Sequence, residues 1–343
     1  MDGDAQLPFE IAGHVVDPGE KRRLHVPAAQ LPTHTSLEIP ITVVNGIRPG
    51  PVLWLSAALH GDELNGLEII RLVLEELGDR PIRGALIALP IVNVLGFLQQ
   101  SRYFPDRRDL NRSFPGSARG SLASRIAHLF MTEVVGRSTH GIDLHTASTD
   151  KSNFPQIRGN LKDAETRRCA EAFAAPITIH SIVRNGSLRA EATKRRKTVL
   201  VYEAGEPQRF NTNAIEIGVA GVLRTMRALG MTSRRTRGRP RPTLVVQGSS
   251  WIRARRGGLL RLEVDEGDFV AAKQHLGTIS DPFGMQRIDV RAPFDGVVIG
   301  RTNNPVVNGG DAVVHVGKLP IAERPAKPLR RARRSEDGRG KRR

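Results

Sequence analysis

The chain has 343 residues and a formal net charge of +17, and 4% of its residues are aromatic. Since a single core rarely grows beyond roughly 250 to 300 residues, this length predicts two domains. The single cysteine, Cys169, excludes a disulfide framework and a cluster of thiolate ligands. No window has about 18 consecutive apolar residues, and the acidic N-terminus resembles no export signal, so we expect a cytoplasmic protein without a membrane partner.

Most of the excess positive charge lies in two segments. The last 23 residues hold ten basic and three acidic residues, and residues 232–242 hold five arginines and no acidic residue. Their Pro, Arg and Gly content predicts a linker at 232–242 and a disordered basic tail at 319–343. Such a tail binds polyanions non-specifically, but neither segment has an aromatic residue to stack on bases, so no specific nucleic-acid partner is expected.

Residues 1–231 alternate apolar runs with segments of helical periodicity. The alternating pattern of residues 8–45 predicts edge strands or a hairpin. Continuous apolar strands between helices indicate an α/β domain, a mostly parallel mixed sheet flanked by helices. The predicted strands are 50–59, 84–92, 140–146 and 197–205, and the predicted helices are 65–78, 121–135, 162–174 and 212–230. Beyond the linker, residues 243–318 show short strands between Gly, Asp and Pro turns, which predicts a smaller all-β domain, a barrel or sandwich.

The stretch "LHGDELNG" places His60 and Glu63 three residues apart, where a strand runs into a helix. Side chains at the carboxyl edge of such a sheet line ligand sites, and one helical turn brings positions i and i+3 together, so the two could bind one metal ion. Asp62 and Glu63 would equally suit a helix N-terminus, so the pair alone decides nothing.

Two further strands end in residues of the same chemistry. The run "HGIDLHT" ends near His145, with Asp143 on the same strand face, and "KTVLVYEAG" carries Glu203 at its end. His145 could complete a three-ligand zinc site. Asp143 could orient that histidine, or only serve as a buried hydrogen-bond partner. Glu203 could act as the base for an attacking water, with Glu206 as a competing choice.

The segment between residues 93 and 116 is punctuated by Pro and Gly and contains Arg102, Asn111 and Arg112. Binding groups concentrate in such connections, and a guanidinium pairs with a carboxylate or polarises a carbonyl. We expect Arg107 and Arg108 to form surface salt bridges instead.

At this point the chain resembles the succinylglutamate desuccinylase/aspartoacylase family, which are zinc deacylases on the zinc-carboxypeptidase fold. The matching pieces, in order, are "HGDE", "NVLGF", "SRYFPDRRDLNRSFPG", "DLHT" and "VYEAG". The resemblance implies one zinc ion on His60, Glu63 and His145, with Glu203 as the general base. It also implies that Arg102 polarises the scissile carbonyl and that Asn111 and Arg112 hold a substrate carboxylate.

Other family features match less well. Members use a further arginine shortly before the catalytic glutamate, for which Arg189 is the candidate, with Arg195 and Arg196 as alternatives. The substrate-binding tyrosine of the aspartoacylase branch has no counterpart, since the only tyrosines are Tyr103 and Tyr202. The C-terminal hairpins are similar to biotinyl/lipoyl-type domains but lack the carrier lysine, so we expect a scaffold or lid.

The sequence therefore predicts a zinc-dependent deacylase, which hydrolyses the N-acyl amide of a small carboxylate-bearing substrate such as an N-acyl amino acid. One alternative is a metallocarboxypeptidase or peptide-processing amidase with a longer groove. Another is a non-catalytic relic whose basic tail binds polyanions. The acyl group, the amine and the oligomeric state, a homo-oligomer included, stay open.

Overall fold

The computed structural model describes residues 5–181, 183–234 and 242–319. Most of the predicted linker, residues 235–241, and the predicted tail from residue 320 onward lie outside these ranges. None of the described helices is long and apolar enough to cross a membrane.

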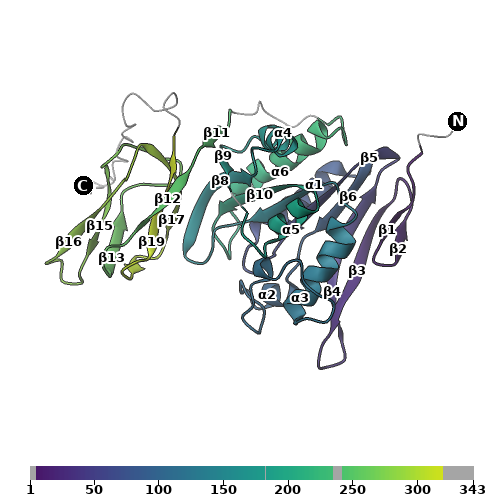
Figure 1. Cartoon of the computed structure of the whole chain (residues 1–343), viewed down its shortest axis with the longest axis horizontal. Coiled ribbons are helices and arrows are strands. Elements are labelled where there is room, and N and C mark those ends of the chain that lie inside the picture. The colour runs from purple at the N-terminus through teal and green to yellow at the C-terminus, as the bar shows by residue number, and fades with distance from the viewer. Residues whose placement is uncertain (1–4, 182, 235–241, 320–343) are drawn as a thin grey trace, which may run out of the picture.

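One sheet of thirteen strands runs through the described chain, and its main path is β12-β19-β17-β8-β10-β7-β5-β6-β4-β3 (Figure 1). The central strands β6, β5, β7 and β10 are parallel neighbours, while β3 and β4 form an antiparallel hairpin at the edge. The predicted mostly parallel centre and N-terminal edge hairpin are therefore confirmed. The strands of this half are β1 (Phe9–Ile11), β2 (His14–Val16), β3 (Lys21–Gln30), β4 (Ser36–Asn45), β5 (Arg48–Ala57), β6 (Arg83–Leu89), β7 (His140–His145), β8 (Lys151–Gly159), β9 (Ile177–His180) and β10 (Thr198–Gly205).

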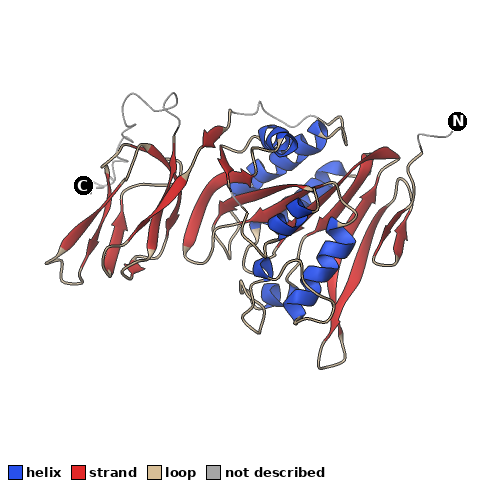
Figure 2. Ribbon diagram, in the orientation of Figure 1, coloured by secondary structure: helices blue, strands red, loops and turns tan. Residues whose placement is uncertain are grey.

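Helices cover both faces of the parallel strands (Figure 2). On one face, α1, α4 and α6 pack their apolar stripes on side chains such as Leu53 and Leu55 of β5. On the other face, α3 and α5 pack near Trp54. Because adjacent residues of one strand are buried on opposite faces, the strand reads as a continuous apolar run. The helices are α1 (Asn65–Leu77), α2 (Val94–Leu98), α3 (Leu122–Leu129) with a π-helical continuation (Phe130–Val135), α4 (Ala164–Phe173), α5 (Leu188–Lys194) and α6 (Thr212–Ala228), with a 3₁₀ turn at Leu110–Arg112.

The C-terminal part is a β sandwich, as predicted. The sheet β16-β15-β13-β18 packs on β12, β17 and β19 through a separate apolar core that includes Leu276, Ile279 and Val314. Its strands are β11 (Leu244–Val246), β12 (Ser249–Arg253), β13 (Gly258–Leu262), β14 (Phe269–Val270), β15 (His275–Ser280), β16 (Arg287–Arg291), β17 (Gly296–Thr302), β18 (Val306–Val307) and β19 (Ala312–Lys318).

Strand β8 joins the two halves. It pairs with β10 on one side, and on the other side with β17 of the sandwich, where Gly300 is the partner of Asn153. Strand β11, which follows the predicted linker, also pairs with β9, which precedes the linker. The division into domains at 1–231 and 243–318 remains a prediction, because the hydrogen-bonded sheet continues across it.

Candidate active site

The loop after β5 and the end of β7 bring three predicted metal ligands together. Strands β5 and β7 are parallel and Ala57 is the register partner of Leu144, so their carboxyl ends meet at one edge of the sheet. His60 and Glu63 lie in the connection to α1, and His145 is the last residue of β7. Gly61 is needed there, because a Cβ atom would lie 1.9 Å from the Gly96 carbonyl carbon.

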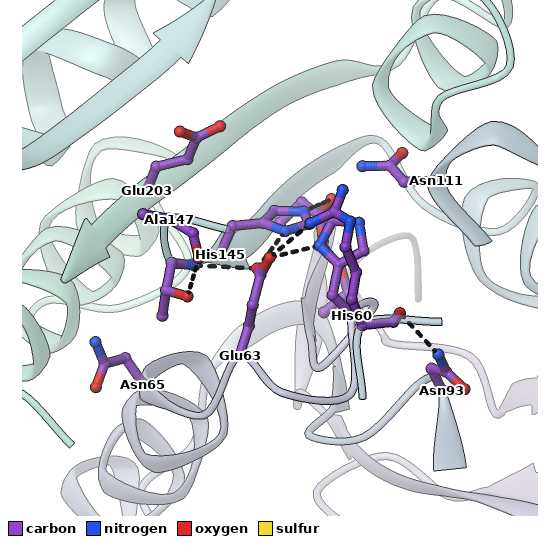
Figure 3. Close-up of polar contacts among 12 residues, drawn as sticks. His60, Glu63, Asn65, Asn93, Asn111, His145, Ala147 and Glu203 are labelled. Atoms are coloured by element: carbon purple, nitrogen blue, oxygen red, sulfur yellow. Dashed lines mark hydrogen bonds and ion pairs between the residues drawn. The ribbon is translucent and has the colours of Figure 1, made fainter. Parts of the chain in front are cut away.

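The three side chains converge on one point (Figure 3). Glu63 Oε1 lies 2.6 Å from His60 Nδ1, and Glu63 Oε2 lies 2.8 Å from His145 Nδ1. All three residues are at least 95% buried. Two imidazole nitrogens and a carboxylate are the donor set of many catalytic zinc centres, and this group can hold a metal ion.

An aspartate carboxylate lies next to the Nε2 atom of each imidazole, on the side of the ring away from Glu63. Asp143 Oδ2 lies 2.7 Å from His145 Nε2, and Ser56 donates a hydrogen bond to the other Asp143 oxygen at 2.7 Å. His60 Nε2 lies 3.3 Å from Asp109 Oδ1, a close contact of opposite charges when the ring is protonated but not a regular hydrogen bond. In each ring Nδ1 therefore faces Glu63 while Nε2 faces an aspartate, the arrangement that fixes histidines that bind metals.

The charges of this group depend on one another. Burial lowers the pKa of both histidines. For His60 this effect is outweighed by Glu63 and Asp109, and for His145 by Asp143 and Glu63, so the pKa of each ring lies above its ordinary value. Burial raises the pKa of Glu63, but the two imidazoles outweigh it and hold that pKa far below its usual range. A buried ionised carboxylate needs a cation beside it, and a divalent ion held by His60, Glu63 and His145 would meet that need.

Arg102 lies beside the predicted ligands and lines the same cavity. Its Nη1 donates to Glu63 Oε1 at 3.2 Å and its Nη2 donates to Asp109 Oδ2 at 3.1 Å. Burial lowers the pKa of Arg102, but Glu63 and Asp109 raise it, so the guanidinium stays charged beside the site. Asp109 was missed by sequence reasoning, although it lies in the matched "DLNR" piece and caps the 3₁₀ turn through the Asn111 amide.

Asn111 and Arg112 line the same cavity as the histidines. Asn111 Oδ1 accepts a hydrogen bond from the Leu188 amide at 3.0 Å, which anchors this side chain to the start of α5. Arg107 and Arg108 are both exposed. Arg108 forms the predicted surface salt bridge, with Asp106 at 3.1 Å, whereas the salt bridge predicted for Arg107 is not found among the described residues.

Glu203 lines the cavity across from the predicted ligands, and on the neighbouring strand it is the register partner of His145. Its Oε2 accepts a hydrogen bond from Asn153 Nδ2 at 2.9 Å and lies 3.2 Å from Arg158 Nη2. Both partners come from β8 and were missed by sequence reasoning. The competing choice, Glu206, does not line this cavity and contacts Asn303 and Arg209 instead.

Arg189 also lines the cavity, where it donates to Ser181 Oγ at 2.8 Å. Burial lowers its pKa, and the nearby Glu203 offsets part of that effect. The alternative Arg195 donates to the Met131 carbonyl instead, and neither Arg195 nor Arg196 lines the cavity.

The cavity has a volume of about 400 Å³. Lys151, Arg158 and Arg184 add to the positive charge of its lining, beside the arginines already described. The sandwich contributes Trp251, whose ring stacks on His315 with centroids 4.6 Å apart. The cavity therefore suits a small anionic molecule, which would have the Trp251 ring on one side.

Comparisons with known proteins place this geometry in context. A family model of the succinylglutamate desuccinylase/aspartoacylase catalytic domain matches residues 49–229, more than half of the chain. An N-alpha-acetyl-L-2,4-diaminobutyric acid deacetylase from Halomonas elongata is 27% identical over 294 residues, which cover 82% of this chain and 86% of the relative.

Solved structures share the fold over most of the chain. A succinylglutamate desuccinylase/aspartoacylase from Rhodobacter sphaeroides superposes with a TM-score of 0.78 at 27% identity, covering 88% of this chain and 95% of that one. The product-bound ectoine utilization protein EutE (DoeB) from Ruegeria pomeroyi has a TM-score of 0.78 at 24% identity, covering 87% of this chain and 94% of that one.

Proposed function

The chain belongs to the succinylglutamate desuccinylase/aspartoacylase family of N-acyl amino acid deacylases, and on this premise we propose that it is a zinc-dependent amidohydrolase acting on an N-acyl amino acid. The observation that carries the proposal is the buried His60, Glu63 and His145 group, which opens into the same cavity as Glu203. A relative that is a deacetylase supports the reaction class.

Zinc is the ion that the donor set favours. His60, Glu63 and His145 would hold it, and Asp143 and Asp109 would fix the imidazoles from behind. When bound, zinc supplies a Lewis acid that activates water near neutral pH and polarises the acyl carbonyl.

Glu203 is the proposed general base. It accepts a proton from the attacking water and returns it to the departing nitrogen, so that the amide C–N bond breaks and a carboxylic acid and an amine are formed. Asn153 donates a hydrogen bond to Oε2, and Arg158 lies beside the same oxygen. We therefore assign the proton to the other carboxylate oxygen, Oε1.

Arginines and an amide handle the charges of the substrate. Arg102, beside Glu63, donates to the carbonyl oxygen as negative charge develops on it. Arg112 and the Asn111 side chain hold the substrate carboxylate, and Arg189 adds a further cation on the Glu203 side. A cavity of about 400 Å³ fits an acylated amino acid more closely than a peptide.

A substrate panel tests the proposal. We expect the zinc-loaded enzyme to release free amine from at least one member of a set of N-acetyl and N-succinyl amino acids, with lower kcat/KM on short peptides. The Glu203→Gln variant serves as the inactive control. If only peptides were hydrolysed, the protein would be a carboxypeptidase instead. If the zinc-loaded protein hydrolysed nothing in the panel, the alternative of a non-catalytic relic would be favoured.

A further inference from the structure

A second group of metal-binding side chains lies at the opposite end of β7. His140 begins the strand that His145 ends, five residues away or about 17 Å along the strand. His140, Glu165 and Cys169 each offer one ligand atom, and these atoms lie within 4.8 Å of one another. Glu165 and Cys169 are four residues apart on α4, so they share one face of that helix.

Two of the three separations between ligand atoms are close to those around a tetrahedral ion. His140 Nε2 lies 3.0 Å from Glu165 Oε1, and Cys169 Sγ lies 3.8 Å from the same oxygen. Around zinc, with Zn–N and Zn–O near 2.0 Å and Zn–S near 2.3 Å, neighbouring ligand atoms stand about 3.3 to 3.5 Å apart. Shifts of a few tenths of an ångström would bring these two separations to those values.

The His140 ring is held with Nε2 toward α4. The Thr139 hydroxyl oxygen lies 2.8 Å from Nδ1 and 3.0 Å from the Val52 carbonyl oxygen, so this end of the ring is fixed at the start of β7. Nε2, at the other end of the ring, lies 3.0 Å from Glu165 Oε1. The ring therefore presents one nitrogen to the face of α4 that carries both other ligands.

The existing contacts of Glu165 and Cys169 leave both side chains available as ligands. Arg168 pairs with both oxygens of Glu165, but the pair is close to half-exposed, and such surface pairs add little stability. Arg168 also donates to the Ala228 carbonyl, which remains available when Glu165 turns to a metal. Burial and Glu165 raise the pKa of the Cys169 thiol to about 12, and a bound cation would oppose both effects.

We propose that His140, Glu165 and Cys169 form a second divalent-metal site, selective for zinc-like ions, which fastens the start of β7 to α4. The ligand set of imidazole, carboxylate and thiolate favours zinc or cobalt over magnesium or calcium. The site is separate from the catalytic group, and this inference does not rest on the proposed function.

Cobalt titration tests the site, because Cys169 is the only cysteine in the chain. A thiolate-to-cobalt charge-transfer band in the near ultraviolet can therefore arise only there. We expect the full-length protein to bind two equivalents of Co²⁺, one of which gives this band, and zinc to bleach it. Cys169→Ser and His140→Gln should each lose the band and one equivalent, and Glu63→Gln should lose the other equivalent and keep the band.

Matched variants separate ligation from misfolding. His128→Gln removes an exposed histidine on α3 and should keep both equivalents and the band. Cys169→Ala provides a second removal of the thiolate, and thermal unfolding checks that each variant folds. Absence of the band from the wild-type protein at saturating cobalt would overturn the site and leave His140 and Glu165 as an ordinary ion pair. A band that persists in a folded His140→Gln variant would overturn the ligand set.

Discussion

At the scale of single residues, the site depends on side chains that hold other side chains in place. Strand ends indicated that His60, His145 and Glu203 would lie close together, because the carboxyl ends of parallel strands meet at one edge. Asp109 and Arg158 could not be predicted in the same way. Each acts through a contact formed across 49 and 45 positions of sequence, with His60 and Glu203, and no local pattern records such a pairing.

Asp143→Asn tests the support of His145. The amide keeps the shape of the side chain but loses the charge that faces His145 Nε2. We expect zinc affinity to fall about 10- to 100-fold, the usual effect of removing such a partner. Competition with a chromophoric chelator measures the affinity, and an unchanged dissociation constant would show that Asp143 only fills space.

Arg102→Gln tests the proposed donor to the carbonyl oxygen. Loss of one such donor raises the barrier by about 3 kcal/mol, which corresponds to roughly a 100-fold fall in kcat/KM. Arg108→Gln is the matched control, because it removes an exposed arginine of the same segment and should leave the rate unchanged. If both variants retain full activity, the oxyanion is stabilised elsewhere.

At the scale of elements, β8 shows where sequence patterns fall short. Its sequence, "KSNFPQIRG", is polar at several positions and contains Pro155, which argues against an inner strand. In the sheet, residues 151–153 pair with β17 and residues 156–159 pair with β9. Pro155 lies where the strand changes partners, so its missing N–H breaks no ladder there. This arrangement delivers Asn153 and Arg158 to Glu203, and it could not be foreseen without the sandwich.

The strand β19 carries a pH-sensitive residue, His315. Burial, with a smaller effect of Arg158, lowers its pKa from 6.5 to about 3. Between these values the unfolded chain binds a proton that the folded protein does not, so stability rises with pH and is lost as the pH falls from 6.5 toward about 3. The slope from this residue is at most about 1.4 kcal/mol per pH unit.

His315→Phe keeps a ring against Trp251 and removes the titrating group. Denaturant unfolding at several pH values should show a free energy of unfolding that falls less steeply with acid in the variant than in the wild-type protein. If the free energy of unfolding fell equally steeply with acid in both proteins, His315 would not take up a proton when the protein unfolds.

At the scale of the whole molecule, the sandwich and the catalytic half share one sheet. The prediction of an α/β half and an all-β half agrees with the fold, since periodicity distinguishes them along the chain. Periodicity could not predict how the two halves connect. The connection depends on the pairing of β17 with β8, which lie more than a hundred residues apart in the sequence. The same connection places Trp251 in the wall of the cavity.

Gly300→Ala tests whether the sandwich controls the base. A Cβ atom at Gly300 would lie 2.6 Å from Asn153 Oδ1, so Asn153 must shift, and with it the hydrogen bond to Glu203. We expect kcat to fall about 10- to 100-fold, since small misplacements of catalytic groups cost that much. Gly248→Ala, where a Cβ atom meets open space, should retain the wild-type rate. Equal activity of the two variants would uncouple the sandwich from the site.

In the proposed enzyme, His60, Glu63 and His145 bind the catalytic zinc ion while Glu203 performs the proton transfer. The most direct test is to measure zinc affinity at this site and turnover of an N-acyl amino acid together, in the wild-type protein, Glu203→Gln and His145→Ala. We expect Glu203→Gln to keep the zinc ion and lose turnover, whereas His145→Ala should lose both. Wild-type turnover by Glu203→Gln, or by a His145→Ala protein that has lost this zinc, would contradict this assignment.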